Sequence, residues 1–199
     1  MNGKPMNWHQ RTVECPYPAA LQDEYRKGTL LRQWYERYRE GHLLFYEEMK
    51  NSDILPYSAP VKDAFGFNEL FVGIKYLDAG YEALCHYRNE AREKAKELLG
   101  GDAAVKKIIT NFESYPQPPD LLVFCPKTNR FRFVECKRKS EKFTKRQEEF
   151  FPEVENYLNK NRPPCERALA DPSREDLFPP LLADQWIHIV RLVPDNVKK

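Results

Sequence analysis

The apolar positions along the chain recur at both helical and strand spacing, which predicts a protein of mixed helices and strands. Stretches with one apolar helical face alternate with short apolar runs that are typical of buried strands. The expected helices cover residues 67–78, 89–99, 103–112 and a stretch from 144 onward. The expected strands cover residues 81–87, 120–125, 131–136 and 186–193. The second and third strands are joined by the short segment PKTNR, which indicates a β-hairpin.

The N-terminal region has a different pattern. Residues 1–20 contain prolines and are expected to be irregular, whereas residues 21–50 have the spacing of one amphipathic helix. The apolar and aromatic face of this helix consists of Leu31, Trp34, Tyr35 and Tyr38. We expect this face to pack on the rest of the protein, and the alternative is an aromatic platform for nucleic-acid bases.

These elements predict an N-terminal helical extension over residues 1–60 and a main α/β domain over residues 61–199, with a helical insertion at about 89–112.

Pro152 should kink or split the helix that begins near Thr144, because proline removes a backbone donor. In the last strand, alternation is expected to place four side chains on one face. They are Trp186, His188, Val190 and Leu192.

The composition, with 41% hydrophobic and 31% charged residues, is that of a folded globular protein rather than a disordered one. The net charge of +2 does not by itself indicate a polyanionic partner. The segment 137–146 is strongly basic and contains a single acidic residue, Glu141. Its basic residues are Lys137, Arg138, Lys139, Lys142, Lys145 and Arg146. Such a run is either a phosphate-binding surface or an ordinary solvated face.

The cysteines and the N-terminus indicate the compartment. Five cysteines without a C-x-x-C pair argue against a disulfide framework and against a thiolate zinc site. No apolar stretch approaches the ~20 residues of a membrane span, and the N-terminus has no signal-peptide core. We therefore expect a cytoplasmic, intracellular protein without a membrane partner.

The histidines show no metal-ligand spacing, and we expect His86 and His188 to be hydrogen-bonded structural residues.

Three charged residues lie at the ends of the expected hairpin strands. Glu135 and Lys137 are two positions apart and therefore share one strand face, while Asp120 begins the neighbouring strand. Two carboxylates and the backbone carbonyl of Cys136 would be hard oxygen ligands suited to Mg²⁺. Lys137 could then position a water and stabilise negative charge on a phosphoryl group. Taken singly, these residues could equally be a turn aspartate and a surface ion pair worth ~0 to 1 kcal/mol.

Pro119-Asp120, followed by Glu135-Cys136-Lys137, resembles the signature of the PD-(D/E)XK nuclease superfamily. The order of elements from Phe67 to Val193 is similar to the core of that superfamily. The resemblance implies an α/β, restriction-endonuclease-like αβββαβ core with a mixed central sheet flanked by helices. Within the superfamily, the chain is most similar to VRR-NUC and Holliday-junction-resolvase-like nucleases, although it has YPQPP where those families often have a glycine.

The resemblance also implies roles for individual residues. Asp120 and Glu135 would bind Mg²⁺, with Mn²⁺ able to substitute, and Lys137 would activate water. Glu69, in GFNELFVGIKYL, matches an acid that supports the metal through a water molecule. It could equally be an ordinary helix acid.

Gln147, in TKRQEEFF, matches a glutamine on the helix after the E-x-K strand. Thr144 and Gln147 also have the spacing of a capping box, which needs no catalytic role.

The expected function is Mg²⁺-dependent hydrolysis of DNA phosphodiester bonds, structure-selective or without sequence preference, on branched or single-stranded DNA. Residues expected to contact DNA are Arg138, Lys139, Lys142, Lys145 and Arg146. In a bacterium or phage, such an enzyme would associate with the nucleoid, and related nucleases often form homodimers. The alternatives are an inactive, nuclease-derived binding or assembly module and a sequence-specific restriction-type enzyme.

Overall fold

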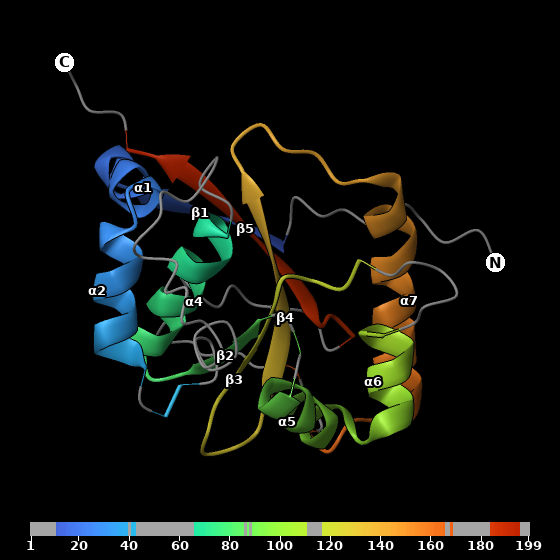
Figure 1. Ribbon diagram of the computed structural model, residues 1–199. Helices are drawn as coiled ribbons and strands as arrows, with labels where there is room; N and C mark the ends of the chain where they lie inside the picture. Colours follow the sequence, from blue (N-terminus) through green and yellow to red (C-terminus); the bar gives the residue numbers. More distant parts are fainter. Residues whose placement is uncertain are drawn as a thin grey trace.

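The computed structural model describes most of the chain. The described residues are 11–39, 41–42, 66–85, 87, 89–110, 117–165, 168 and 184–195. Within them, the protein is an α/β structure with one five-stranded mixed sheet and six helices (Figure 1). The strands are β1 (Thr12–Tyr17), β2 (Glu82–Cys85), β3 (Leu121–Phe124), β4 (Phe131–Arg138) and β5 (Ile187–Pro194). The helices are α1 (Ala19–Arg26), α2 (Thr29–Tyr38), α4 (Phe67–Asp78), α5 (Asn89–Leu99), α6 (Asp102–Ile108) and α7 (Lys145–Asn161).

The sheet combines an antiparallel and a parallel half. Its strand order is β1-β5-β4-β3-β2. Strands β2, β3 and β4 pair antiparallel, whereas β4, β5 and β1 pair parallel. The central strand β4 is therefore where the two halves meet, and its side chains are covered on both faces of the sheet.

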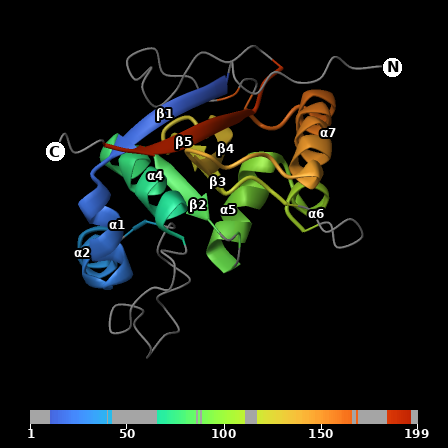
Figure 2. The same cartoon turned by 90° about the horizontal axis from the view of Figure 1, so that it is seen from above.

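Helices cover both faces (Figure 2). One apolar cluster joins α1, α2 and α4 to one face of the sheet, and a second joins α5, α6 and α7 to the other. Alternation along β4 sends Phe131 and Phe133 into the α7 cluster and Val134 and Cys136 into the α4 cluster. None of the described helices combines the length and the apolar character needed to cross a membrane.

The order of elements expected from Phe67 onward is confirmed, including the inserted helical pair and the β3–β4 hairpin. Helices α4 and α5 have the bounds that the apolar spacing predicted. The aromatic face of α2 also packs on the main body as expected. The ring of Trp34 stacks on that of Phe67 with centroids 6.2 Å apart, and Leu31 and Tyr38 are buried.

The N-terminal region differs from the expectation in two respects. Residues 12–17 are not irregular but form β1, an edge strand parallel to β5. The single helix expected over 21–50 is two helices, because Gly28 adopts a left-handed conformation (φ 81°) between α1 and α2. The stretch 43–50 lies outside the described residues.

Two further expectations need correction. A split of the last helix at Pro152 is wrong, since α7 runs continuously through this residue and buries Phe151 and Val154 on either side, whereas a kink there remains a prediction. Trp186 precedes β5 and is therefore not bound by strand alternation. It packs on Phe131 in the α7 cluster, at 5.1 Å between ring centroids, whereas Val190 and Leu192 belong to the α4 cluster.

Candidate functional site

The register of the β3–β4 hairpin brings Asp120 and Glu135 together. Leu121 pairs with Val134, so Asp120, directly before β3, lies opposite Glu135. The Oδ2 atom of Asp120 accepts a hydrogen bond of 2.7 Å from the backbone N–H of Cys136. The convergence expected from the sequence is therefore present, and the Cys136 side chain points to the opposite face as predicted.

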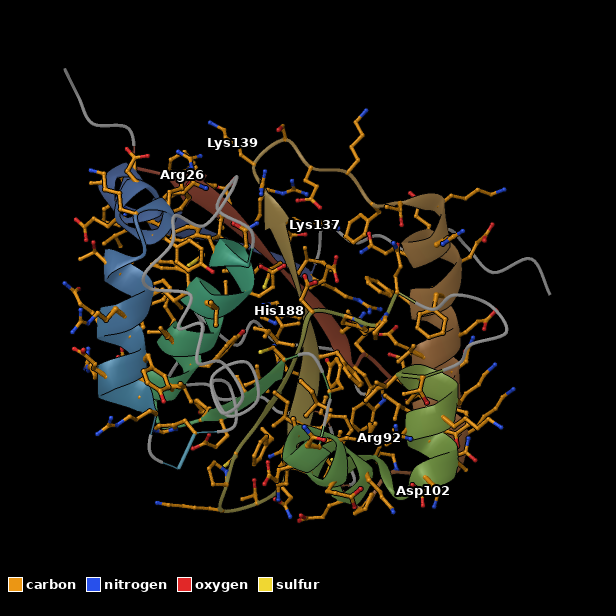
Figure 3. All side chains as sticks on the ribbon, in the orientation of Figure 1. Arg26, Arg92, Asp102, Lys137, Lys139 and His188 are labelled. Atoms are coloured by element: carbon orange, nitrogen blue, oxygen red, sulfur yellow. The ribbon has the colours of Figure 1, made fainter. Side chains whose placement is uncertain are left out.

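Glu135 and Lys137 both contact Gln147 of α7 and are almost fully buried, and Figure 3 shows Lys137 between β4 and α7. The Lys137 ammonium donates to Glu135 Oε1 at 2.7 Å and to Gln147 Oε1 at 2.9 Å. The Gln147 amide donates in turn to Glu135 Oε1 at 2.6 Å. These three side chains form a closed hydrogen-bonded set, so the interpretation of Glu135 and Lys137 as a surface ion pair is wrong.

Gln147 also belongs to the capping box of α7. The Thr144 hydroxyl accepts from the Gln147 backbone N–H at 3.2 Å, and Gln147 Oε1 accepts from the Thr144 backbone N–H at 3.2 Å. The cap holds the start of α7 and thereby points the Gln147 side chain at Glu135 and Lys137. The capping box is thus confirmed, whereas a catalytic role of Gln147 remains a prediction.

Burial raises the pKa of both carboxylates at the site, and neighbouring acids add to the rise only for Asp120. Burial, followed by the charges of Glu135 and Glu69, raises the pKa of Asp120 well above its usual range. Burial also raises the pKa of Glu135, although Lys137 opposes this increase. For Lys137, burial favours the neutral amine, but Glu135 and Glu141 outweigh it and raise the pKa. This grouping of one buried and two half-buried acids favours a site that takes up a cation.

One acceptor in this cluster has no partner within the described structure. Glu135 Oε2 is buried and makes no hydrogen bond there. Glu135 lines a cavity of about 560 Å³ between the start of α4, the start of β3, the end of β4 and the start of α7. Asp120, Glu69, Lys137 and Gln147 line the same cavity. A buried carboxylate oxygen without a partner is costly unless a ligand satisfies it.

The side chains of this cavity can supply only some of the ligands that a hard divalent cation needs. Among the described residues, no group of three or more His, Cys, Asp or Glu side chains is arranged to hold a metal ion. Asp120 and Glu135 are two carboxylates, and Mg²⁺ commonly binds through one or two carboxylates while it keeps waters and substrate oxygens. The carbonyl of Cys136 and a water-mediated contact to Glu69 remain predictions.

The basic segment lies at the mouth of the cavity. Arg138 lines the cavity together with Ser140, and its neighbours along the segment are exposed. These neighbours are Lys139, Lys142, Lys145 and Arg146. Arg191 of β5 holds this segment, because its Nη1 lies 3.0 Å from the carbonyl oxygens of residues 138, 139 and 141. Contact of the segment with DNA remains a prediction.

Sequence reasoning missed three residues that hold the site. Glu141 Oε1 lies 3.2 Å from Lys137 Nζ, and its position as the single acid of the basic run was the available signal. The Tyr87 hydroxyl donates to the carbonyl of Pro119 at 2.8 Å and so fixes the backbone beside Asp120. Gln117 accepts from the Thr144 hydroxyl at 2.7 Å. The latter two contacts join distant parts of the chain and leave no local pattern.

The remaining candidates lie outside the site. His188 is fully buried and structural, but neither ring nitrogen has a hydrogen-bond partner in the part of the chain described, so the expected hydrogen bond is wrong. His86 lies outside the described residues. All five cysteines are free thiols, as expected.

Comparison with known proteins adds no relative: the chain matches no protein-family model, no curated protein and no solved structure.

Proposed function

We propose that this protein is a divalent-metal-dependent nuclease that hydrolyses DNA phosphodiester bonds at the Asp120–Glu135–Lys137 site. The observation that carries the proposal is the half-buried Asp120 and the buried Glu135 carboxylate beside the Lys137 ammonium in the lining of one cavity, with Glu135 Oε2 unpartnered in the described structure. The hairpin, the mixed sheet and the order of elements support a restriction-endonuclease-like core as part of the same proposal.

Asp120 and Glu135 would hold Mg²⁺ or Mn²⁺. The ion would lower the pKa of a bound water and offset negative charge on the phosphoryl group. Lys137 is held by Glu135 and Gln147 with its ammonium at the cavity, where it can orient a nucleophilic water and stabilise the phosphoryl oxygens. Gln147 positions both of these side chains from the capped start of α7.

The exposed basic segment would contact the DNA backbone. Its lysines and arginines recognise phosphates without reading bases, which favours a structure-selective or sequence-independent substrate. A protein that binds DNA with a steep salt dependence, yet cleaves nothing with Mg²⁺ or Mn²⁺, would instead be a nuclease-derived binding module.

A cleavage assay tests the proposal. Single-stranded, duplex, flap and four-way DNA are incubated with Mg²⁺ or Mn²⁺ and the wild type, Asp120→Asn or Lys137→Ala. We expect each variant to lose at least about a hundredfold in rate, as enzymes do when a charge-stabilising group is removed. Lys106→Ala, which removes an exposed lysine of α6 outside both the cavity lining and the basic segment, is the control and should keep most of the activity. Wild-type activity in both site variants would refute the assignment.

A further inference from the structure

The Lys137 ammonium has three hydrogens, and three side chains accept from it. The distances from Nζ are 2.7 Å to Glu135 Oε1, 2.9 Å to Gln147 Oε1 and 3.2 Å to Glu141 Oε1. Since an ammonium has only three donors, a substrate can receive a hydrogen bond from Lys137 only if one of these partners leaves.

Glu141 is the partner that can leave. The side chains of Lys137 and Glu135 are 3% and 2% exposed, whereas that of Glu141 is 42% exposed and its bond to Lys137 is the longest. Water can solvate the Glu141 carboxylate after release, and an ion pair with such an exposed partner contributes little to stability.

The second oxygen of Glu141 accepts from a backbone donor. Oε2 accepts from the backbone N–H of Arg138 at 3.1 Å, so one carboxylate spans an ammonium and a backbone amide. Two non-bridging oxygens of a phosphodiester can accept from the same pair of donors, because charged and backbone N–H groups are common phosphate ligands. These donors lie at the cavity that also holds Asp120 and Glu135.

The backbone of the loop is held independently of the Glu141 side chain. The Glu141 N–H donates to the Arg138 carbonyl at 3.0 Å, which closes a turn. Arg191 additionally binds three carbonyl groups of this turn. Displacement of the carboxylate therefore exposes Lys137 Nζ and the Arg138 N–H without dismantling the loop.

We infer that Lys137 Nζ and the Arg138 N–H form a phosphate-binding site, and that Glu141 fills this site until a phosphodiester of the nucleic-acid strand displaces it. That the phosphate belongs to a nucleic-acid strand rests on the proposed function. The phosphate-binding site itself rests on the positions of the Lys137 and Arg138 donors. Glu141 is thus a built-in competitor of the substrate rather than a ligand of the metal.

The first test uses inorganic phosphate as the probe. Thermal unfolding is followed in chelator, with and without phosphate, for the wild type, Glu141→Gln and Glu148→Gln. Glu148, an exposed acid in the first turn of α7, controls for the loss of one negative charge. We expect phosphate to raise the unfolding temperature of Glu141→Gln clearly more than that of Glu148→Gln. Equal shifts in the two variants would overturn the inference.

The second test uses a short single-stranded DNA in chelator, so that binding is measured without cleavage. Glu141→Gln should bind at least about fivefold more tightly than Glu148→Gln, which corresponds to about 1 kcal/mol. The gain should disappear when Lys137→Met is added. A gain no greater than that of Glu148→Gln, or one that survives Lys137→Met, would contradict displacement.

Cleavage with Mg²⁺ is measured separately on the same variants. A selective gain of phosphate binding in Glu141→Gln, with no DNA cut by this variant or by the wild type, would sustain the phosphate site and refute the nuclease proposal. Cleavage by the wild type, with no selective phosphate gain in Glu141→Gln, would sustain the nuclease proposal and refute the phosphate site.

Discussion

Two buried glutamates, Glu155 and Glu135, show what separates a structural acid from a candidate functional one. Glu155 lies in the middle of α7, and its Oε1 accepts from the Arg11 guanidinium and from the backbone N–H groups of Trp186 and Ile187 at 2.8 and 3.0 Å. It thereby fixes the start of β5. Glu135 has Lys137 and Gln147 as partners and lines a cavity, but its second oxygen has no partner in the described structure.

The two glutamates share the properties that burial confers. Both are almost inaccessible, and burial raises the pKa of each while a cation opposes the shift. What differs is the environment. Glu135 lies beside a second acid, Asp120, at a cavity, whereas Glu155 is bound by a cation and two backbone donors. The open acceptor and the neighbouring like charge, rather than burial or a shifted pKa, therefore distinguish Glu135 as the candidate functional acid.

The largest expected effect is on stability, from Glu155→Ala. The substitution leaves the buried Arg11 guanidinium without its carboxylate and removes the acceptor of two backbone donors, which should cost about 3–5 kcal/mol in the free energy of unfolding. Urea unfolding measures this loss. Glu153→Ala, at an exposed position of the same helix, should change it by less than about 1 kcal/mol. Equal losses in the two variants would show that Glu155 has no special role.

The His188 side chain is buried and does not line the cavity. Its ring nitrogens have no hydrogen-bond partner within the described residues. Burial, and then the charge of Arg132, lowers its pKa well below the usual range. The unfolded chain therefore binds the proton more readily, and stability should fall as pH drops below the unfolded pKa of about 6.5, by up to about 1.4 kcal/mol per pH unit.

The measurement is urea unfolding at a series of pH values from neutral to mildly acidic, on either side of that unfolded pKa. His188→Leu should show a shallower loss of stability than the wild type over this range. Parallel curves would mean that protonation of His188 contributes nothing to the acid sensitivity of the fold.

The smallest expected effect on stability comes from Asp120→Asn. Asparagine keeps an oxygen to accept from Cys136 N–H and removes a half-buried charge that lies near Glu135 and Glu69. In chelator, the variant should be about 0.5–2 kcal/mol more stable than the wild type, as expected where function conflicts with stability. A clear loss in thermal or urea unfolding would place Asp120 with Glu155 among the structural acids.

Local patterns predicted the parts of the fold and site that depend on spacing. The apolar periodicity of residues 67–78 gave the bounds of α4, and alternation in β4 placed Glu135 and Lys137 on one face. The hairpin then brought Asp120 beside them. These relationships span few residues, so the sequence displays them directly.

Features made by distant contacts were missed. Pro16 and its neighbours predict an irregular segment where β1 lies, but an edge strand tolerates proline, and the partner of β1 is β5 at the other end of the chain. Arg11 meets Glu155 across 144 positions of sequence, and Tyr87 reaches Pro119 across 32. Neither contact has a local signature that periodicity or spacing could reveal.

The central claim is that Asp120 and Glu135 share a divalent cation. A crystal structure of the protein grown with Mn²⁺ tests it most directly, through the anomalous signal of the metal. We predict a peak between the two carboxylates, with metal–oxygen distances of about 2.1 Å, and no such peak in Asp120→Asn crystals. A wild-type structure with Mn²⁺ present but no ion at this position, and with Glu135 Oε2 bound to a protein donor instead, would contradict it.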